Sequence, residues 1–286
     1  MMNVIRTSRA GFCMGVALAL RKLDSMVAAR EGEQVATLGE IIHNPQVLED
    51  YARKGVRRLG SASEAEADMA VLIRAHGVTR SMEEELRGRC SRVEDATCPR
   101  VKKAQLAIAE ATAPGRELLL YGEADHPEVR GLISYAAGPS HIFSSPEELA
   151  GLLSGVSFEG RAVVLAAQTT QDRLIFDEMR AELSSRFGES LIVLDTICDA
   201  TRQRQEEAGE LAGRVQAMVV AGGKTSGNTR RLAELARMRG VPTVLVETAD
   251  ELDRSFFEGV ETVGLTAGAS TPGYIIDEVE ARLRSW

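Results

Sequence analysis

The chain has 286 residues, of which 44% are hydrophobic and 27% are charged, as in ordinary soluble globular proteins. Its net charge of −8 argues against a nucleic-acid or anionic-membrane partner, and its 4% aromatic content argues against base stacking. The first residues do not resemble a signal peptide, and no apolar run approaches the ~20 residues of a membrane span. We therefore expect a cytoplasmic protein whose four cysteines are reduced.

Apolar periodicity predicts helices and strands in alternation along the chain. Asn44 is a good helix cap and Pro45 suits the first helical position, so a helix should run from there to about residue 54. The elements expected in the first third are a helix over 14–30, a strand over 34–38, this helix, a strand over 67–74, a helix from about 80 and a strand over 92–96.

The remaining two thirds repeat the same plan. The second third should hold a helix over 101–112, a strand over 117–121, a helix opened by 126–127, a strand over 161–167, a helix over 173–187 and a strand over 191–194. The last third should hold a helix over 202–214, a strand over 217–221, a helix after 228–229, strands over 243–246 and 262–266, and a final helix. Such alternation predicts parallel sheets covered by helices on both faces.

A short pattern recurs at a spacing of 100 residues. Three residue types match, with Asp95, Cys98 and Gln105 in one copy and Asp195, Cys198 and Gln205 in the other. A looser third copy surrounds Cys13. We therefore predict three small α/β domains with pseudo-threefold symmetry, over 15–97, 98–194 and 195–286, with residues 1–14 packing on the third.

Polar residues gather where the predicted strands end. Ligands of open parallel sheets bind outside the carboxyl ends of the strands, and helices that open there present free N–H groups suited to a phosphate. A single such residue can be an ordinary cap, and a lone histidine is more often a satisfied polar residue than a ligand. Together they favour a site for an anion: His43, His76, His126, Glu128, Gln168, Thr169, Ser226, Asn228 and Ser270.

Two nucleotide-binding motifs are absent. The run Gly223-Lys224-Thr225 resembles the end of a P-loop, but the first glycine of that motif would fall at Met218. No G-x-G-x-x-G follows the first predicted strand, so nicotinamide binding in a Rossmann site is unsupported.

The cysteines lack the close pairing of zinc ligands. Three isolated cysteines, one per repeat, would instead converge on the pseudo-threefold axis, where three thiolates suit three corners of a cubane iron–sulfur cluster. The fourth iron would then lack a protein ligand and could take a substrate oxygen. Cys90 has no counterpart in the other repeats and is not expected to be a ligand.

With these motifs the sequence resembles the 4-hydroxy-3-methylbut-2-enyl diphosphate reductase (LytB) family over nearly its whole length. The matching motifs are Ala10-Gly-Phe-Cys13-x-Gly-Val, Ile42-His43-Asn-Pro-x-Val, Arg74-Ala-His76-Gly-Val, Asp95-Ala-Thr-Cys98-Pro, His126-Pro-Glu128-Val, Gln168-Thr-Thr, Thr196-Ile-Cys198-x-Ala-Thr-x-x-Arg-Gln, Ser226-x-Asn228-Thr and Ala269-Ser270-Thr-Pro.

The resemblance implies a trefoil of three α/β domains around one 4Fe-4S cluster per chain, with a fourth iron that has no protein ligand. It implies Cys13, Cys98 and Cys198 as the metal ligands. It implies as catalytic residues Glu128, Thr169 and His126, of which the first two form the proton-delivery pair. The substrate-binding residues that it implies are His43, His76, His126, Thr169, Ser226, Asn228 and Ser270. Many members carry a second serine where this chain has Gly227, so a backbone N–H would replace that hydroxyl.

The resemblance also implies an oxidoreductase of isoprenoid biosynthesis. Such an enzyme removes the C4 hydroxyl of the allylic diphosphate in the last step of the non-mevalonate pathway, with electrons from ferredoxin or flavodoxin. One alternative is a quinolinate-synthase-like cluster dehydratase, which shares the three repeats and three cysteines. Another is a non-catalytic iron–sulfur redox sensor, which would need no anion site. The His-Pro-Glu and Ser-x-Asn-Thr turns favour the diphosphate substrate.

Overall fold

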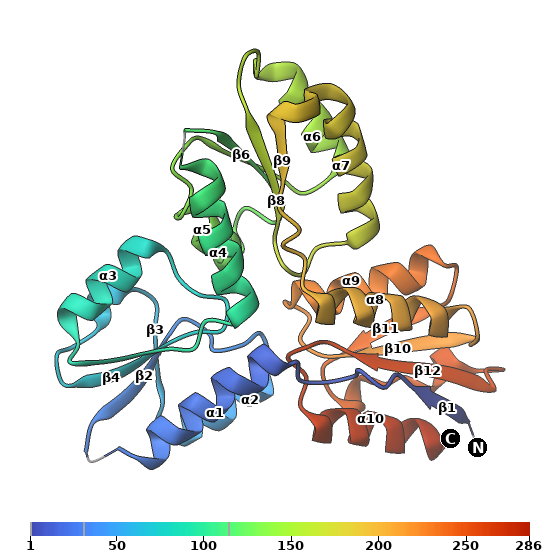
Figure 1. Cartoon of the computed structure of the whole chain (residues 1–286). Helices are drawn as coiled ribbons and strands as arrows, with labels where there is room; N and C mark the ends of the chain where they lie inside the picture. Colours follow the sequence, from blue (N-terminus) through green and yellow to red (C-terminus); the bar gives the residue numbers. More distant parts are fainter. Residues whose placement is uncertain (1, 31, 114) are drawn as a thin grey trace. The chain divides into compact units, whose positions relative to one another are not determined.

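The computed structural model describes residues 2–30, 32–113 and 115–286, and these residues form three parallel sheets (Figure 1). Each sheet has four strands in an equivalent order, β3-β2-β4-β5 in the first, β7-β6-β8-β9 in the second and β11-β10-β12-β1 in the third. Every strand pair is parallel. The prediction of three parallel-sheet α/β domains is confirmed.

Apart from the strand over Arg57–Leu59, which was not predicted, the elements of the first sheet and its helices follow the predicted order. The strands are β2 (Gln34–Leu38), β3 (Arg57–Leu59), β4 (Met69–Ile73) and β5 (Arg92–Asp95). The helices of this part of the chain are α1 (Met14–Ala28), α2 (Pro45–Arg53) and α3 (Arg80–Arg89), with a short 3₁₀ turn over Ala62–Glu64. Asn44 accepts the Val47 N–H at 3.0 Å, so the predicted cap of α2 is confirmed.

The second sheet consists of β6 (Glu117–Tyr121), β7 (Ser140–Phe143), β8 (Val163–Ala167) and β9 (Leu191–Val193). Its helices are α4 (Pro99–Thr112), α5 (Pro127–Ile133), α6 (Pro146–Gly155) and α7 (Arg173–Phe187). A 3₁₀ turn over Gly188–Ser190 leads into β9.

The third sheet consists of β10 (Ala217–Ala221), β11 (Thr243–Val246), β12 (Thr262–Ala267) and the amino-terminal strand β1 (Asn3–Arg6). Its helices are α8 (Asp199–Ala212), α9 (Gly227–Met238) and α10 (Gly273–Arg284), with 3₁₀ turns over Ala249–Glu251 and Arg254–Phe257. The register of β1 on β12 places Asn3 beside Thr262 and Arg6 beside Leu265.

The second sheet shows how the cores are built. Alternate residues of its central strands face opposite sides, as the two-residue period of a strand requires. Leu119 and Leu165 belong to the core under α6 and α7, whereas Leu118 and Val164 belong to the core under α4 and α5. Both faces of the sheet are therefore buried, which explains why its strands read as continuous apolar runs.

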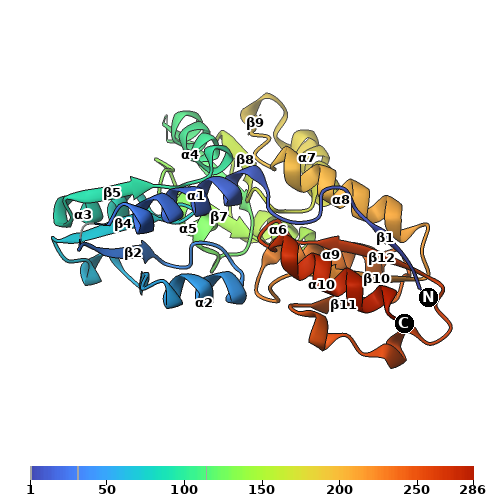
Figure 2. The ribbon, with the colours of Figure 1, turned by 90° about the horizontal axis from the view of Figure 1, so that it is seen from below.

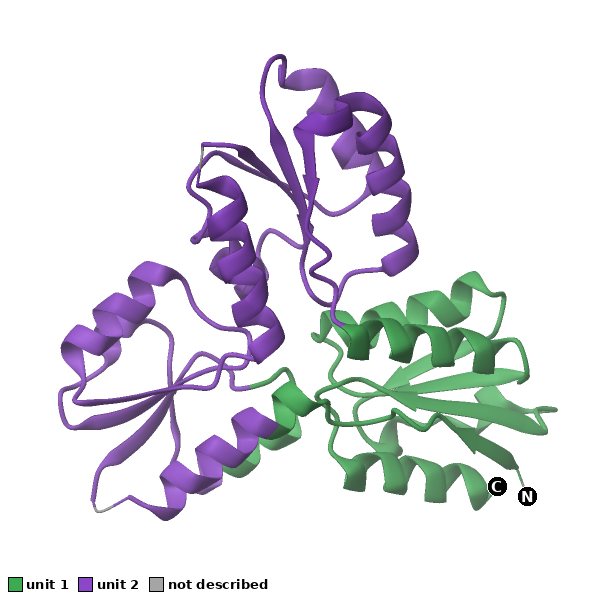
Figure 3. Cartoon of the chain, in the orientation of Figure 1, with its two compact units in different colours: residues 1–17, 42–51, 199–286 green, residues 18–41, 52–198 purple. Residues whose placement is uncertain are grey.

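Contacts within the chain group it into two compact units (Figure 3). One unit comprises residues 1–17, 42–51 and 199–286 and contains the third sheet; the other comprises 18–41 and 52–198 and contains the first and second sheets. In the first of these units the two chain ends lie side by side (Figures 1 and 2), and Arg284 donates to the Val4 carbonyl at 3.0 Å. None of the described helices is long and apolar enough to cross a membrane.

Candidate active site

The catalytic candidates of the second sheet lie at the carboxyl ends of β6 and β8. Glu128 is in the first turn of α5 and is only 2% exposed, and Thr169 follows β8 and is buried. The Thr169 backbone N–H donates to one carboxylate oxygen of Glu128 at 2.6 Å, and its hydroxyl donates to the other at 3.0 Å. Thr169 therefore fixes both oxygens of a buried carboxylate, which is the geometry expected of a positioned acid–base group.

His126 caps the same helix. Its Nδ1 accepts the Glu128 backbone N–H at 3.1 Å, which leaves Nε2 as the nitrogen that carries the proton in the neutral ring. The ring of His76, which follows β4, meets the ring of His126 edge-on with centroids 5.4 Å apart. The structure thus brings together Glu128, Thr169, His126 and His76 within one unit.

A half-buried arginine supports the His76 turn. Arg74 donates from Nε to the Gly77 carbonyl at 3.2 Å, and its guanidinium covers Gly39, where a β-carbon would collide with it. Burial, with a contribution from Arg130, lowers the pKa of Arg74 against the opposing effect of Glu40. The turn after β4 is therefore fixed to the turn after β2.

The other predicted binding residues gather around the third sheet. Ser226 caps α9 and accepts the Thr229 N–H at 3.4 Å. Asn228 is 6% exposed, and its side-chain NH₂ has no hydrogen-bond partner among the described residues. Ser270, in the turn after β12, donates to the His43 carbonyl at 3.0 Å. An unpartnered, buried amide donor at the end of a parallel sheet is suited to an anionic ligand.

Each of the three matched cysteines has the same local setting. The Cys98 N–H donates to the Ala75 carbonyl at 2.9 Å, the Cys198 N–H to Thr169 at 2.9 Å and the Cys13 N–H to Ala269 at 3.1 Å. Each cysteine directly precedes a helix, and each sulfur-bearing residue is half-buried and free of disulfides. Soft thiolates presented at helix N-termini fit the donor set of an iron–sulfur cluster.

Cys90 differs from the other three. It is buried, its thiol donates to the Glu66 carbonyl at 3.3 Å, and burial raises its pKa. A protonated thiol that is already hydrogen-bonded is a poor metal ligand, so Cys90 remains outside the predicted ligand set.

Some residues that support the site escaped the sequence analysis. Thr229 is fully buried against Gly222 and Gly268, between the turns that carry Ser226 and Ser270. Its place directly after Asn228 in a matched motif was the available signal. Gln168 was among the candidates, but its amide bonds the turns after β6 and β8: the oxygen accepts from the Glu123 N–H and from Gln171, and the NH₂ donates to Thr170.

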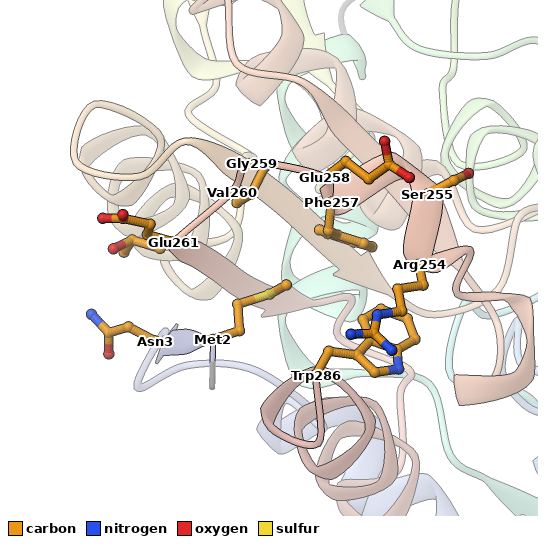
Figure 4. A pocket seen from close by; sticks show the side chains of 11 residues that line it. Met2, Asn3, Arg254, Ser255, Phe257, Glu258, Gly259, Val260, Glu261 and Trp286 are labelled. Atoms are coloured by element: carbon orange, nitrogen blue, oxygen red, sulfur yellow. The ribbon is translucent and has the colours of Figure 1, made fainter.

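A cavity of about 890 Å³ lies at the opposite, amino-terminal edge of the third sheet (Figure 4). Its walls include Met2 before β1, Glu261 before β12, and the side chains of Phe257 and Trp286. It contains no predicted site residue, so the candidate active site is not this cavity.

The chain is similar to known proteins over nearly its whole length. The chain matches the family model described as LytB protein over residues 4–284. A protein of Desulfovibrio desulfuricans named 4-hydroxy-3-methylbut-2-enyl diphosphate reductase is 52% identical over 99% of this chain and 100% of its own length. A protein of the same name from Geobacter sulfurreducens is 45% identical, over 100% of this chain and 98% of its own length.

Solved structures give the same result for the fold. The E-1-hydroxy-2-methyl-but-2-enyl-4-diphosphate reductase of Plasmodium falciparum superposes with a TM-score of 0.91 at 22% identity, covering 98% of this chain and 87% of that one. A structure described as the terminal enzyme of the non-mevalonate pathway, (E)-4-hydroxy-3-methyl-but-2-enyl diphosphate reductase, is 37% identical with a TM-score of 0.69 and covers both chains fully. These matches do not favour the dehydratase or sensor alternatives. The chain belongs to the LytB protein family, whose members are iron–sulfur proteins.

Proposed function

We propose that the chain reduces 4-hydroxy-3-methylbut-2-enyl diphosphate. The C4–O bond breaks, the hydroxyl leaves as water, and two electrons and two protons are consumed, giving isopentenyl and dimethylallyl diphosphate. The observation that carries the proposal is the buried Glu128 carboxylate held at both oxygens by Thr169. The names of the full-length relatives supply the substrate.

We propose one 4Fe-4S cluster per chain as the cofactor, held by Cys13, Cys98 and Cys198. The matched backbone hydrogen bond of each cysteine supports this ligand set, because it gives the three thiols equivalent local geometry. When bound, the cluster would supply single electrons and, at an iron without a protein ligand, Lewis-acid chemistry toward the substrate hydroxyl. A trefoil arrangement of the three domains would bring the three cysteines to one cluster.

We propose that neutral hydrogen-bond donors and imidazoles bind the diphosphate. His43, Ser226, Asn228 and Ser270 come from the unit with the third sheet, and His76 and His126 from the other unit. The unpartnered side-chain NH₂ of Asn228 supports this role. Gly227 is the first residue of α9 and is buried, so its backbone N–H would take the place of the serine that the family resemblance implies.

Glu128 holds and delivers the proton. Thr169 orients both carboxylate oxygens, and the His126 cap fixes the backbone on which Glu128 stands. The side chain is thereby pre-positioned to protonate the departing hydroxyl, and burial keeps bulk water from competing with it.

We propose a ferredoxin or flavodoxin as the cytoplasmic electron donor. Both are small acidic proteins. Arg100 and Lys103 are exposed on the first turns of α4, close in sequence to Cys98, and their charge suits an acidic partner. Charge-steered electron transfer would slow as salt rises, which stopped-flow reduction at increasing ionic strength measures.

The proposed function is tested by product formation under strict anaerobiosis. Brown, cluster-containing protein with a chemical reductant should consume the allylic diphosphate and release both five-carbon diphosphates. A quinolinate-synthase-like enzyme or a sensor would leave that substrate unchanged, and so would contradict the proposal.

A further inference from the structure

The first turns of α8 contain an arginine that the mechanism leaves without a role. Arg204 lies six residues after Cys198 and is 4% exposed. Its guanidinium donates to the backbone carbonyl of Arg9 and, at 3.1 Å, to the carbonyl of Ala267 at the end of β12. One buried side chain therefore joins the segment before Cys13 to the turn that carries Ser270.

Glu207, one turn further along the same face of α8, binds the N–H groups of the same segment. Its two carboxylate oxygens accept the backbone N–H of Ser8 at 2.6 Å and that of Arg9 at 3.1 Å. Burial alone would raise the pKa of Glu207, but these hydrogen bonds outweigh it and lower the pKa overall. The carboxylate therefore stays charged at neutral pH, and charge-assisted hydrogen bonds are stronger than neutral ones.

The held segment leads directly to Cys13. Gly11 adopts a φ of +104°, and a β-carbon there would lie 3.2 Å from Ile276 and 3.4 Å from the Thr271 carbonyl. The Cys13 N–H then bonds Ala269. The segment over residues 8–13 thus contacts α8, α10 and the turn after β12, all within one unit, while Ser8, Arg9 and Phe12 stay exposed.

We propose that Arg204 and Glu207 are positioning residues that hold the Cys13 segment and the Ser270 turn in one fixed relation. The consequence for the cluster rests on the proposed function, because it requires Cys13 to be a ligand. Both hydrogen bonds leave from Nη1 of Arg204, which carries two N–H groups, one for each carbonyl. Groups that orient metal ligands change metal affinity about 10–100-fold when they are removed.

The chain offers a matched control on the same helix. Arg202 is also an arginine of α8, but it is 38% exposed and pairs with Glu206 at 2.7 Å. Arg202→Gln removes a surface charge and no contact with the Cys13 segment. Glu207→Gln is a milder change than Arg204→Gln, because an amide oxygen still accepts one of the two N–H groups.

The test uses two measurements on the full-length protein. Hydrogen exchange of peptides covering residues 7–13 follows the segment itself and needs no cluster. Release of iron to a chelator under anaerobiosis follows the cluster. We expect Arg204→Gln to speed exchange at least about 10-fold and iron release about 10–100-fold, Glu207→Gln to act in the same direction, and Arg202→Gln to behave as wild type.

Wild-type exchange in Arg204→Gln would overturn the proposal whatever the activity. Faster exchange with unchanged iron release would overturn the consequence for Cys13. A wild-type protein without bound iron would instead contradict the proposed function, and exchange would still decide whether the segment is held. If Arg204→Gln does not fold, hydrogen exchange of residues 7–13 is compared between Glu207→Gln and Arg202→Gln. Equal exchange in these two variants would overturn the proposal.

Discussion

Thr169 holds the Glu128 carboxylate with two hydrogen bonds, of 2.6 Å from its backbone N–H and 3.0 Å from its hydroxyl. The carbonyl of the same threonine accepts the Cys198 N–H at 2.9 Å. One residue at the end of β8 thus connects the proposed proton donor with a proposed cluster ligand. The positions of Glu128 and Cys198 therefore depend on the same residue.

The Thr169 hydroxyl can be removed without losing the backbone bond. Thr169→Val removes the hydroxyl hydrogen bond to one buried carboxylate oxygen of Glu128, which costs about 1–3 kcal/mol. If that cost appears in the transition state, kcat/KM should fall roughly 10–100-fold. Steady-state kinetics of Thr169→Val against Thr170→Val, whose hydroxyl accepts only from Gln168 among the described contacts, checks this. Equal kcat/KM values for Thr169→Val and Thr170→Val would contradict the role of the Thr169 hydroxyl.

Serine substitution at the three matched cysteines and at Cys90 should have different effects on the amount of bound iron. Serine at position 13, 98 or 198 should abolish most bound iron and the brown colour, because serine is a poorer cluster ligand than a thiolate. Cys90→Ser should keep both, since a serine hydroxyl can still donate to the Glu66 carbonyl. Iron and sulfide analysis after anaerobic purification decides, and bleaching by Cys90→Ser would contradict the assignment.

Gly268 makes room for Thr229 between two binding turns. A β-carbon at 268 would collide with the Thr229 hydroxyl and lie 3.2 Å from its Cβ. Gly268→Ala should therefore cost about 1–3 kcal/mol of stability, as overpacking does, and should raise KM by displacing the turn with Ser226 and Asn228. Gly273→Ala is the control, because nothing lies within 4 Å of its β-carbon. Denaturant unfolding gives the stability of both variants and steady-state kinetics gives their KM. Equal stability and equal KM in Gly268→Ala and Gly273→Ala would contradict the role of Gly268.

The start of the second sheet has an acid-sensitive contact. Glu117 is 3% exposed; burial raises its pKa, but hydrogen bonds from His141, at 2.7 Å, and from Arg161 lower it overall. A lowered folded pKa stabilises the protein above the ordinary value of 4.5, and that stabilisation is lost as pH falls through the folded pKa. Glu117→Gln should be less stable than the wild type at pH 7. The difference between their free energies of unfolding, measured in unfolding curves, should narrow below about pH 4.5. A difference in free energy of unfolding that does not change with pH would contradict this role of the Glu117 carboxylate.

The sequence was sufficient for the elements with strong periodicity and for the repeat. Central strands such as β6 and β8 are continuous apolar runs, and α2 was located by its Asn44 cap. Strands β3 and β7 were missed because they are short edge strands of mixed composition, Arg-Arg-Leu and Ser-His-Ile-Phe. Helix α6, whose Ser145 cap and Pro146 are ordinary signals, was also missed.

Other features depend on contacts between distant segments. Strand β1 pairs with β12 across about 260 residues of sequence, which no local pattern encodes. Helix α8 begins at Asp199, directly after Cys198, rather than at the predicted 202. Arg204 was visible only as part of a motif, because its function depends on carbonyls of residues 9 and 267 that the fold brings to it.

Glu128→Gln tests the central claim most directly. Glutamine keeps the size of the side chain and an oxygen that can accept from Thr169, but it cannot donate a carboxylic proton. The account predicts a cluster-replete variant whose turnover, normalised to bound iron, falls about 10²–10⁴-fold. If Glu128 only stabilised the first turn of α5, the change would cost about 0.3–1 kcal/mol of stability and leave turnover near wild type, and that result would contradict the account.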